Sequence, residues 1–256
     1  MGRSFNQNLK AMLKINIIAI TIMVCAIAIN SSYFLDIKDL PEKNFVNISF
    51  TKYVTENCDT ADSDCNEETV TLKGFASGVA FKSDEEFSYI LTADHFCDPT
   101  DISEIMFPIS DHALDFWITD HQGVSQVADI VYSDSIFDLC ILRSKMKIEN
   151  EVYVADKIPK MGEKVYAISA PHGMQENDIS FHFEGLFSGC DINDMCFFTI
   201  PATSGSSGSL VLDKRGSVIG MIQMTIVGFE NISMGVGSRS IKLFLDQASE
   251  ETGIQF

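Results

Sequence analysis

The sequence from Ala202 to Met221 reads A-T-S-G-S-S-G-S-L-V-L-D-K-R-G-S-V-I-G-M and contains the pattern that decides the fold. A Gly/Ser-rich turn precedes an apolar run, a polar turn at 214–216 and a second apolar run, which predicts two antiparallel strands. Glycine lets a chain turn tightly and point successive N–H groups at one place, as an oxyanion requires. Ser207 would project from that turn as a nucleophile, although a Gly/Ser loop between strands is more often an ordinary hairpin.

A serine nucleophile needs a base, and the base needs an acid that orients it. His95 ends a strongly apolar strand in I-L-T-A-D-H-F-C, and Asp138 directly precedes the apolar run L-C-I-L. Each has a plain structural interpretation, His95 as a turn histidine and Asp138 as a strand-start cap. The order of histidine, aspartate and serine in one chain favours the functional interpretation. His95, Asp138 and Ser207 are therefore the candidate catalytic residues.

The chain after Asp36 reads as short strands separated by turns, which is typical of an all-β barrel or sandwich. Segments 74–81 and 87–93 predict a hairpin, and 241–248 has the spacing of a closing helix. Further strands are expected over 46–50, 104–109, 114–119, 125–132, 139–143, 164–170, 179–187, 196–200, 209–213, 217–226 and 234–237. A division near residue 150 separates two halves, 36–150 and 151–256.

The N-terminal segment 1–35 carries an apolar run over 15–29. Three basic residues and no acidic one precede the run, an asymmetry that predicts an N-terminus held inside and a following chain sent across a membrane. The run is shorter than the roughly 20 residues of a spanning helix, and Ala26-Ile27-Ala28 fits a signal cleavage site. A signal peptide and an uncleaved membrane anchor both remain open, with a buried core helix as the third alternative. The working domain is expected to be periplasmic, extracellular or anchored on the non-cytoplasmic side.

The net charge of the chain is −18, from 36 acidic and 18 basic residues. A chain this acidic is repelled by phosphate backbones, so we expect no nucleic-acid partner. Membrane contact is expected only through the N-terminal segment.

Six of the seven cysteines lie outside the apolar run, an even number that suits an oxidising compartment. Two pairs, Cys58 with Cys65 and Cys190 with Cys196, flank short polar segments typical of hairpin tips closed by disulfides. Cys97 and Cys140 remain, and they pair only if the fold brings them together; buried thiols are the alternative. The chain has no C-x-x-C or H-E-x-x-H pattern, so we expect no metal site and no cofactor.

Three blocks, T-A-D-H at 92–95, D-L-C-I-L at 138–142 and G-S-S-G-S at 205–209, resemble the motifs of chymotrypsin-fold (trypsin-like) serine proteases. The closest likeness is to the bacterial HtrA/Deg-type protease domain, and it extends over roughly 70–248. It implies an all-β fold of two six-stranded antiparallel β-barrels with a C-terminal helix, preceded here by the N-terminal apolar helix. The first barrel would carry His95 and Asp138 and the second Ser207. A following PDZ domain is not expected.

The resemblance also implies a role for each matched residue. Ser207 would be the nucleophile, His95 the general base and acid, and Asp138 the group that fixes the imidazole tautomer. The N–H groups of Gly205 and Ser207 would form the oxyanion hole. If this triad forms, the segments of Cys97 and Cys140 are adjacent, so a disulfide between them is implied.

Substrate contacts follow from the same resemblance. The segment Ile222-Gln223-Met224 would be the edge strand that pairs with the substrate backbone, and Pro201 would lie near the base of the specificity pocket. No acidic residue occurs there, so a small or medium apolar residue is a better expected substrate side chain than Arg or Lys.

Three positions depart from the family pattern. Ser206 stands where relatives activated by cleavage have an aspartate, so activation of that kind is not expected. Ser209-Leu210 stands in place of the usual Gly-Pro pair. Asp94 lies directly before His95, where it would raise the pKa of the histidine or point away from it. The expected function is an exported serine endopeptidase acting on polypeptides. The alternative is a catalytically inactive binding module with the same fold, while a lectin-like sandwich would need the motifs to coincide by accident.

Overall fold

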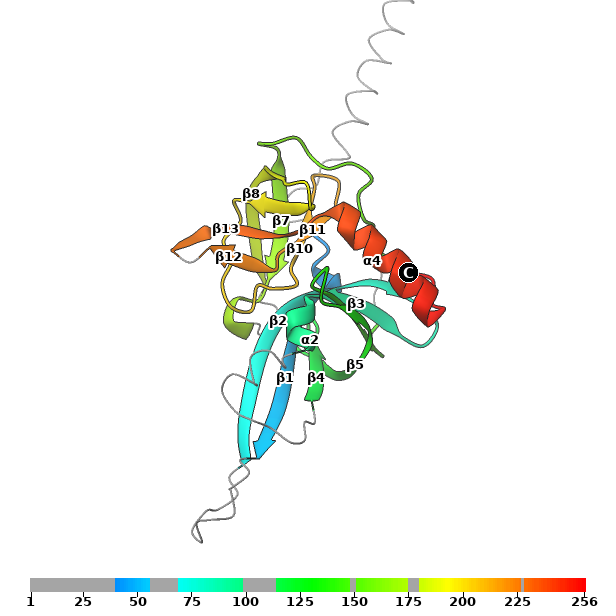
Figure 1. Cartoon of the computed structure of the whole chain (residues 1–256). Coiled ribbons are helices and arrows are strands. Elements are labelled where there is room, and N and C mark those ends of the chain that lie inside the picture. The colour runs from blue at the N-terminus through cyan, green and yellow to red at the C-terminus, as the bar shows by residue number, and fades with distance from the viewer. Residues whose placement is uncertain (1–39, 56–68, 99–113, 148–150, 175–179, 227) are drawn as a thin grey trace, which may run out of the picture.

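The computed structural model describes residues 40–55, 69–98, 114–147, 151–174, 180–226 and 228–256 (Figure 1). The predicted strand 104–109, the predicted Cys58–Cys65 bridge and the N-terminal segment lie outside these residues. Within the described ranges, no helix is both long and apolar enough to cross a membrane.

The first half of the chain forms a closed antiparallel barrel in the strand order β1-β2-β3-β6-β5-β4. Its interior is filled by alternate side chains of the strands, among them Val46, Ile48, Ile90 and Phe116, as the period of two along a strand requires. Because β4 pairs with β1, the strand order closes on itself. The six strands are β1 (Phe45–Thr55), β2 (Thr69–Ser83), β3 (Ser88–Thr92), β4 (Leu114–Thr119), β5 (Ser125–Asp134) and β6 (Leu139–Ser144).

The second half forms a seven-stranded sheet in the order β11-β10-β7-β8-β9-β13-β12. A bridge between Gly220 and Gly237 brings β11 beside the end of β13, so the sheet curls around a core that includes Phe187 and Phe198. The strands are β7 (Lys164–Ser169), β8 (Phe181–Cys190), β9 (Met195–Phe198), β10 (Leu210–Leu212), β11 (Val218–Met221), β12 (Met224–Ile226) and β13 (Phe229–Val236).

The sheet has one strand more than the six expected because the predicted strand 217–226 is broken at Ile222 and Gln223. The N–H of Ile222 donates to the carbonyl of Ser209 (2.8 Å), and its carbonyl accepts from the N–H of Gly208 (2.8 Å). Both backbone groups of Ile222 are thus bonded to the Gly/Ser loop instead of to a neighbouring strand. The chain leaves β11 at this point and starts β12 two residues later.

The closing helix α4 (Ser238–Thr252) is longer at both ends than the predicted 241–248. Its first turn is capped by Asp194, whose carboxylate accepts from the N–H of Ser240 (2.9 Å) and from Arg239 (3.2 Å). Gly253, with a φ of 72°, ends the helix in the left-handed conformation common at C-termini. The buried Phe244 packs against Tyr132 and Phe137 of the first barrel, so the helix that follows the second sheet covers the first barrel.

Two disulfides lie among the described residues, Cys97–Cys140 and Cys190–Cys196. The first joins the short helix α2 (Asp94–Cys97) to β6 across a sequence separation of 43 residues. Closing a loop of that length in the unfolded chain stabilises the fold by about 4 kcal/mol in the chain-entropy model. The second closes the β8–β9 hairpin whose turn carries Asp194.

The two halves meet where the Gly/Ser loop packs on Ser77 of β2. The N–H of Ser77 donates to the carbonyl of Ser207 (2.8 Å), and its hydroxyl donates to the carbonyl of Gly205 (2.8 Å). The same hydroxyl accepts from the N–H of Ala170 at the end of β7 (2.9 Å). Gly208 has a φ of +88°, and a Cβ on it would overlap the carbonyl oxygen of Ser77. A side chain at position 208 would therefore separate the loop from the barrel.

Replacing Gly208 by alanine is expected to destabilise the protein more than replacing Gly162, a glycine with nearly the same φ (+85°) and no atom near its Cβ position. Both substitutions carry the penalty of a left-handed alanine, about 1 kcal/mol, but only Gly208→Ala adds the overlap with Ser77. We expect a further loss of roughly 1–3 kcal/mol in the free energy of unfolding, measured by urea denaturation. Equal losses would show that the loop does not need this close approach.

Candidate active site

His95 and Asp138 lie next to each other on the first barrel, at the start of α2 and directly before β6. The Nδ1 atom of His95 is 3.0 and 2.9 Å from the two carboxylate oxygens of Asp138. The backbone N–H of His95 donates to the same carboxylate (2.8 Å). Since a carboxylate accepts, Nδ1 carries the ring proton and Nε2 is left as the basic nitrogen. In the neutral form of the ring, the basic nitrogen is therefore Nε2, the one that does not face Asp138.

The hydrogen bond that His95 donates to the Asp138 carboxylate raises the pKa of His95 above its ordinary value of 6.5. Partial burial of the ring opposes this, and the charges of Asp138 and Asp94 raise the pKa further. The carboxyl group of Asp94 is itself buried and hydrogen-bonded by Ser133, and burial raises its pKa. Asp94 therefore acts on His95 through its charge.

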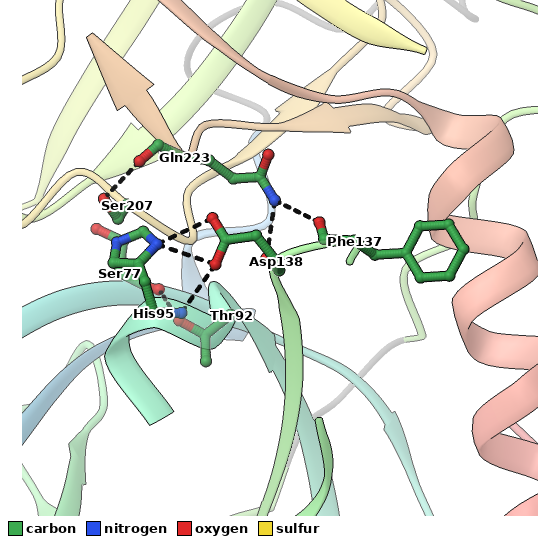
Figure 2. A network of polar contacts seen from close by, with 7 residues as sticks. All are labelled: Ser77, Thr92, His95, Phe137, Asp138, Ser207 and Gln223. Atoms are coloured by element: carbon green, nitrogen blue, oxygen red, sulfur yellow. Dashed lines mark hydrogen bonds and ion pairs between the residues drawn. The ribbon is translucent and has the colours of Figure 1, made fainter. Parts of the chain in front are cut away.

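Ser207 is half-buried in the loop between β9 and β10. Its hydroxyl donates to the carbonyl of Gln223 (3.0 Å), and Figure 2 draws the imidazole of His95 between the Asp138 carboxylate and the Ser207 side chain. The carbonyl of Ser77 accepts from the hydroxyl of Thr92 (2.9 Å), three residues before His95. The loop that carries Ser207 is thus held against the strand that leads to His95.

The loop also presents two backbone donors beside Ser207. Gly205 has a φ of +89°, and a Cβ there would press on the carbonyl of Ala170 and the N–H of His172. The N–H of His172 donates to the carbonyl of Ser204 (2.6 Å), which fixes this side of the loop. Among the hydrogen bonds of the described residues, none uses the N–H groups of Gly205 or Ser207.

The residues expected to bind substrate differ in how exposed they are. Pro201 is exposed at the start of the loop, whereas Ile222 is buried and its backbone groups are used within the chain. Gln223 is 5% exposed, and Met224 is 43% exposed at the start of β12, the edge strand. Of the expected pairing segment Ile222-Gln223-Met224, only Met224 is thus well exposed.

One group of metal-ligating residue types lies among the described residues, Cys190, Asp194 and Cys196. The two cysteines are joined in a disulfide and Asp194 caps α4. All three side chains are therefore already used, two by the disulfide and one by the helix cap.

Two residues contribute to the site in ways that the sequence analysis did not predict. Ser77 joins the loop to β2, and the side chain of Gln223 contacts the turn of Asp138. Neither carries a charge or lies at a spacing that points to a site. Ser77 lies in 74–81, a segment predicted to form one strand of a hairpin, and that position is the one signal that the sequence offers.

Comparison with known proteins gives related sequences and a related fold. Residues 76–221 match the family model described as "Trypsin-like peptidase domain". The chain is 27% identical to the serine protease Do-like HtrB of Bacillus subtilis (strain 168) over 187 residues, 67% of this chain and 38% of that protein. It is 27% identical over 202 residues to the serine protease Do-like HtrA of the same organism, 72% of this chain and 40% of that protein. The chain thus spans about two fifths of the length of these curated relatives.

A solved structure, that of the serine endoprotease from Yersinia pestis, aligns with a TM-score of 0.58 and 19% identity. The alignment covers 84% of this chain and 66% of that one, and it shows the same double-barrel fold. The family match, from β2 to β11, spans more than half of the chain and includes His95, Asp138 and Ser207. By its sequence and by its fold, the chain belongs to the trypsin-like peptidase domain family.

Proposed function

We propose that this protein is an exported serine endopeptidase that cleaves polypeptides through a Ser207–His95–Asp138 triad. The observation that carries the proposal is the Asp138 carboxylate bonded to both the backbone N–H and Nδ1 of His95. It leaves Nε2 as a base on the side of the ring where Figure 2 draws Ser207. The family membership supports the same activity.

The reaction begins when the Ser207 hydroxyl turns from the Gln223 carbonyl towards Nε2 of His95. Nε2 takes the hydroxyl proton as Oγ attacks the peptide carbonyl, and Asp138 stabilises the imidazolium that forms. The N–H groups of Gly205 and Ser207 bind the oxyanion, where one donor is typically worth about 10²–10³ in rate. The imidazolium then protonates the leaving amine, and water, deprotonated by the same base, releases the acyl group.

The substrate is proposed to be an extended polypeptide that pairs with the edge of the second sheet at Met224 and at the carbonyl of Gln223. That carbonyl becomes free when the Ser207 hydroxyl turns to His95, whereas the N–H of Gln223 is bonded to the carbonyl of Met234 (3.1 Å). Pro201 and the neighbouring loop would contact the side chain before the scissile bond. The absence of an acidic residue near Pro201 in the sequence favours a small or medium apolar side chain at that position.

Export is proposed from the N-terminal segment 1–35, as a signal peptide or anchor, with barrels at 36–150 and 151–256 forming the exported part. The two disulfides among the described residues support an oxidising compartment.

A fluorophosphonate probe, which reacts with activated serines, tests the proposal on the full chain produced under oxidising conditions. We expect an adduct at Ser207, located by peptide mapping. Ser207→Ala should give none, and His95→Ala should slow labelling by several orders of magnitude, since removing the base of a triad lowers turnover roughly 10⁶-fold. A folded wild-type protein that takes no label would contradict the proposal and favour the binding module.

The pH dependence of labelling tests the electrostatics around His95. Only the neutral imidazole acts as a base, so labelling should fall as the pH drops through the raised pKa of His95, above 6.5. Asp138 and Asp94 are the acids that raise this pKa. Asp94→Asn removes one of these charges, so the acidic limb of the pH profile, where the labelling rate falls, should move to lower pH. The control Asp246→Asn, on the exposed face of α4, should leave the limb in place. An unmoved limb in Asp94→Asn would show that Asp94 does not act on His95.

A further inference from the structure

The turn that carries Asp138 is held in an unfavourable backbone conformation. Asp138 has a φ of +51°, in the left-handed region that residues with a side chain adopt at a penalty of roughly 1 kcal/mol. The turn joins β5 to β6, and its path decides where the carboxylate points. The Asp134 carboxylate holds the start of the turn by accepting from the N–H groups of Ile136 (2.7 Å) and Phe137 (3.4 Å), and contacts from other parts of the chain hold its end.

The side chain of Gln223 supplies such a contact from the second half of the molecule. Its Nε2 donates to the carbonyl of Phe137 (2.8 Å) and to the carbonyl of Asp138 (2.7 Å), as Figure 2 shows. Consecutive carbonyl groups of an extended chain point in opposite directions, so their convergence on one nitrogen requires a bent backbone. The positive φ of Asp138 provides that bend.

The opposite side of the turn is held by packing. The ring of Phe137 lies against Phe244 of α4, with ring centroids 6.4 Å apart. The turn is thus fixed between an apolar contact to the helix and the amide of Gln223, which is itself 5% exposed.

Gln223 also contacts the other end of the proposed triad, because its backbone carbonyl accepts from the Ser207 hydroxyl (3.0 Å). We propose that Gln223 is a positioning residue whose side-chain amide holds the Asp138 turn, and through it the carboxylate that orients His95. This inference rests on the proposed function. It assigns the Gln223 side chain to the acid of the triad, in addition to the backbone pairing with substrate proposed above.

The amide is suited to this position because one nitrogen carries two N–H donors, one for each carbonyl. Methionine has a similar length and no donor, so Gln223→Met would leave both carbonyl groups unpaired with little change in volume. A group that served the fold alone would alter stability and leave the ionisation of His95 unchanged. A positioning group would alter both the reactivity of Ser207 and the pKa of His95.

The test compares Gln223→Met with the wild-type full chain and with Gln247→Met, a matched control on the exposed face of α4. The readouts are the rate of fluorophosphonate labelling and the pKa of His95 from NMR titration of its ring protons. We expect Gln223→Met to label roughly 10²-fold more slowly, the loss that a displacement of about 1 Å at a catalytic group can produce. The pKa of His95 should fall, because the hydrogen bond that His95 donates to Asp138 is what chiefly raises it. The control should match the wild type in both.

Gln223→Met is also made in an Asp138→Asn variant. This double variant shows whether Gln223 acts through Asp138 or independently of it. If Gln223 acts through Asp138, adding Gln223→Met to Asp138→Asn should cause little further loss of rate. Fully additive losses would overturn the inference, and so would wild-type labelling with an unchanged His95 pKa in Gln223→Met. Should Gln223→Met fail to fold, Gln223→Leu gives the same readouts.

If the wild-type protein does not label, the proposed function is contradicted, but the positioning role of Gln223 is still tested separately. The His95 titration then decides it alone. A lower pKa in the variant supports the positioning role, and an unchanged pKa overturns it.

Discussion

The packing of the Gly/Ser loop on Ser77 is the contact on which the rest of the site depends. The proposed base and acid belong to the first barrel and the proposed nucleophile to the second sheet, so their geometry is set by the contact between the halves. Ser77 bonds to the carbonyl groups of Gly205 and Ser207 and to the N–H of Ala170. Because Ser77 lies within β2 of a closed barrel, the groups that it offers to the loop are rigidly placed.

Local strain in the site is balanced by contacts that come from distant parts of the chain. Asp138, Gly205 and Gly208 all have positive φ values. The Asp138 turn is held by Gln223 and by the packing of Phe137 on α4, and the loop is held by Ser77 and the backbone of His172. Of these three residues only Asp138 is strained, because glycine adopts a positive φ without steric cost. Asp138 carries one of the proposed reactive groups, which is where backbone strain is commonly found.

The double-barrel fold was predictable because alternating apolar runs, turn residues and three motif blocks all agreed. The adjacency of His95 and Asp138 followed from the same motifs, and the structure brings these two side chains together. The length of α4 was not predictable, since its capping acceptor, Asp194, lies more than forty residues earlier. The break at Ile222 was missed because the segment is apolar throughout, and its backbone groups are diverted to the Gly/Ser loop. The part played by the Gln223 side chain depends on a contact across 85 residues, which no local pattern reveals.

The two halves differ in how much unpaired backbone they leave to solvent. In the first half the strands close into a barrel, but β2 pairs with β3 only from Val79 to Ser83, so its N-terminal part extends beyond that pairing. On the second sheet, β11 is covered by Tyr153 to Ala155 and by Gly237. The other edge of the second sheet is β12, which is three residues long and has an irregular register to β13. So short an edge offers an incoming chain only a few hydrogen bonds. The molecule can keep one strand open beside Ser207 and still resist edge-to-edge aggregation between copies.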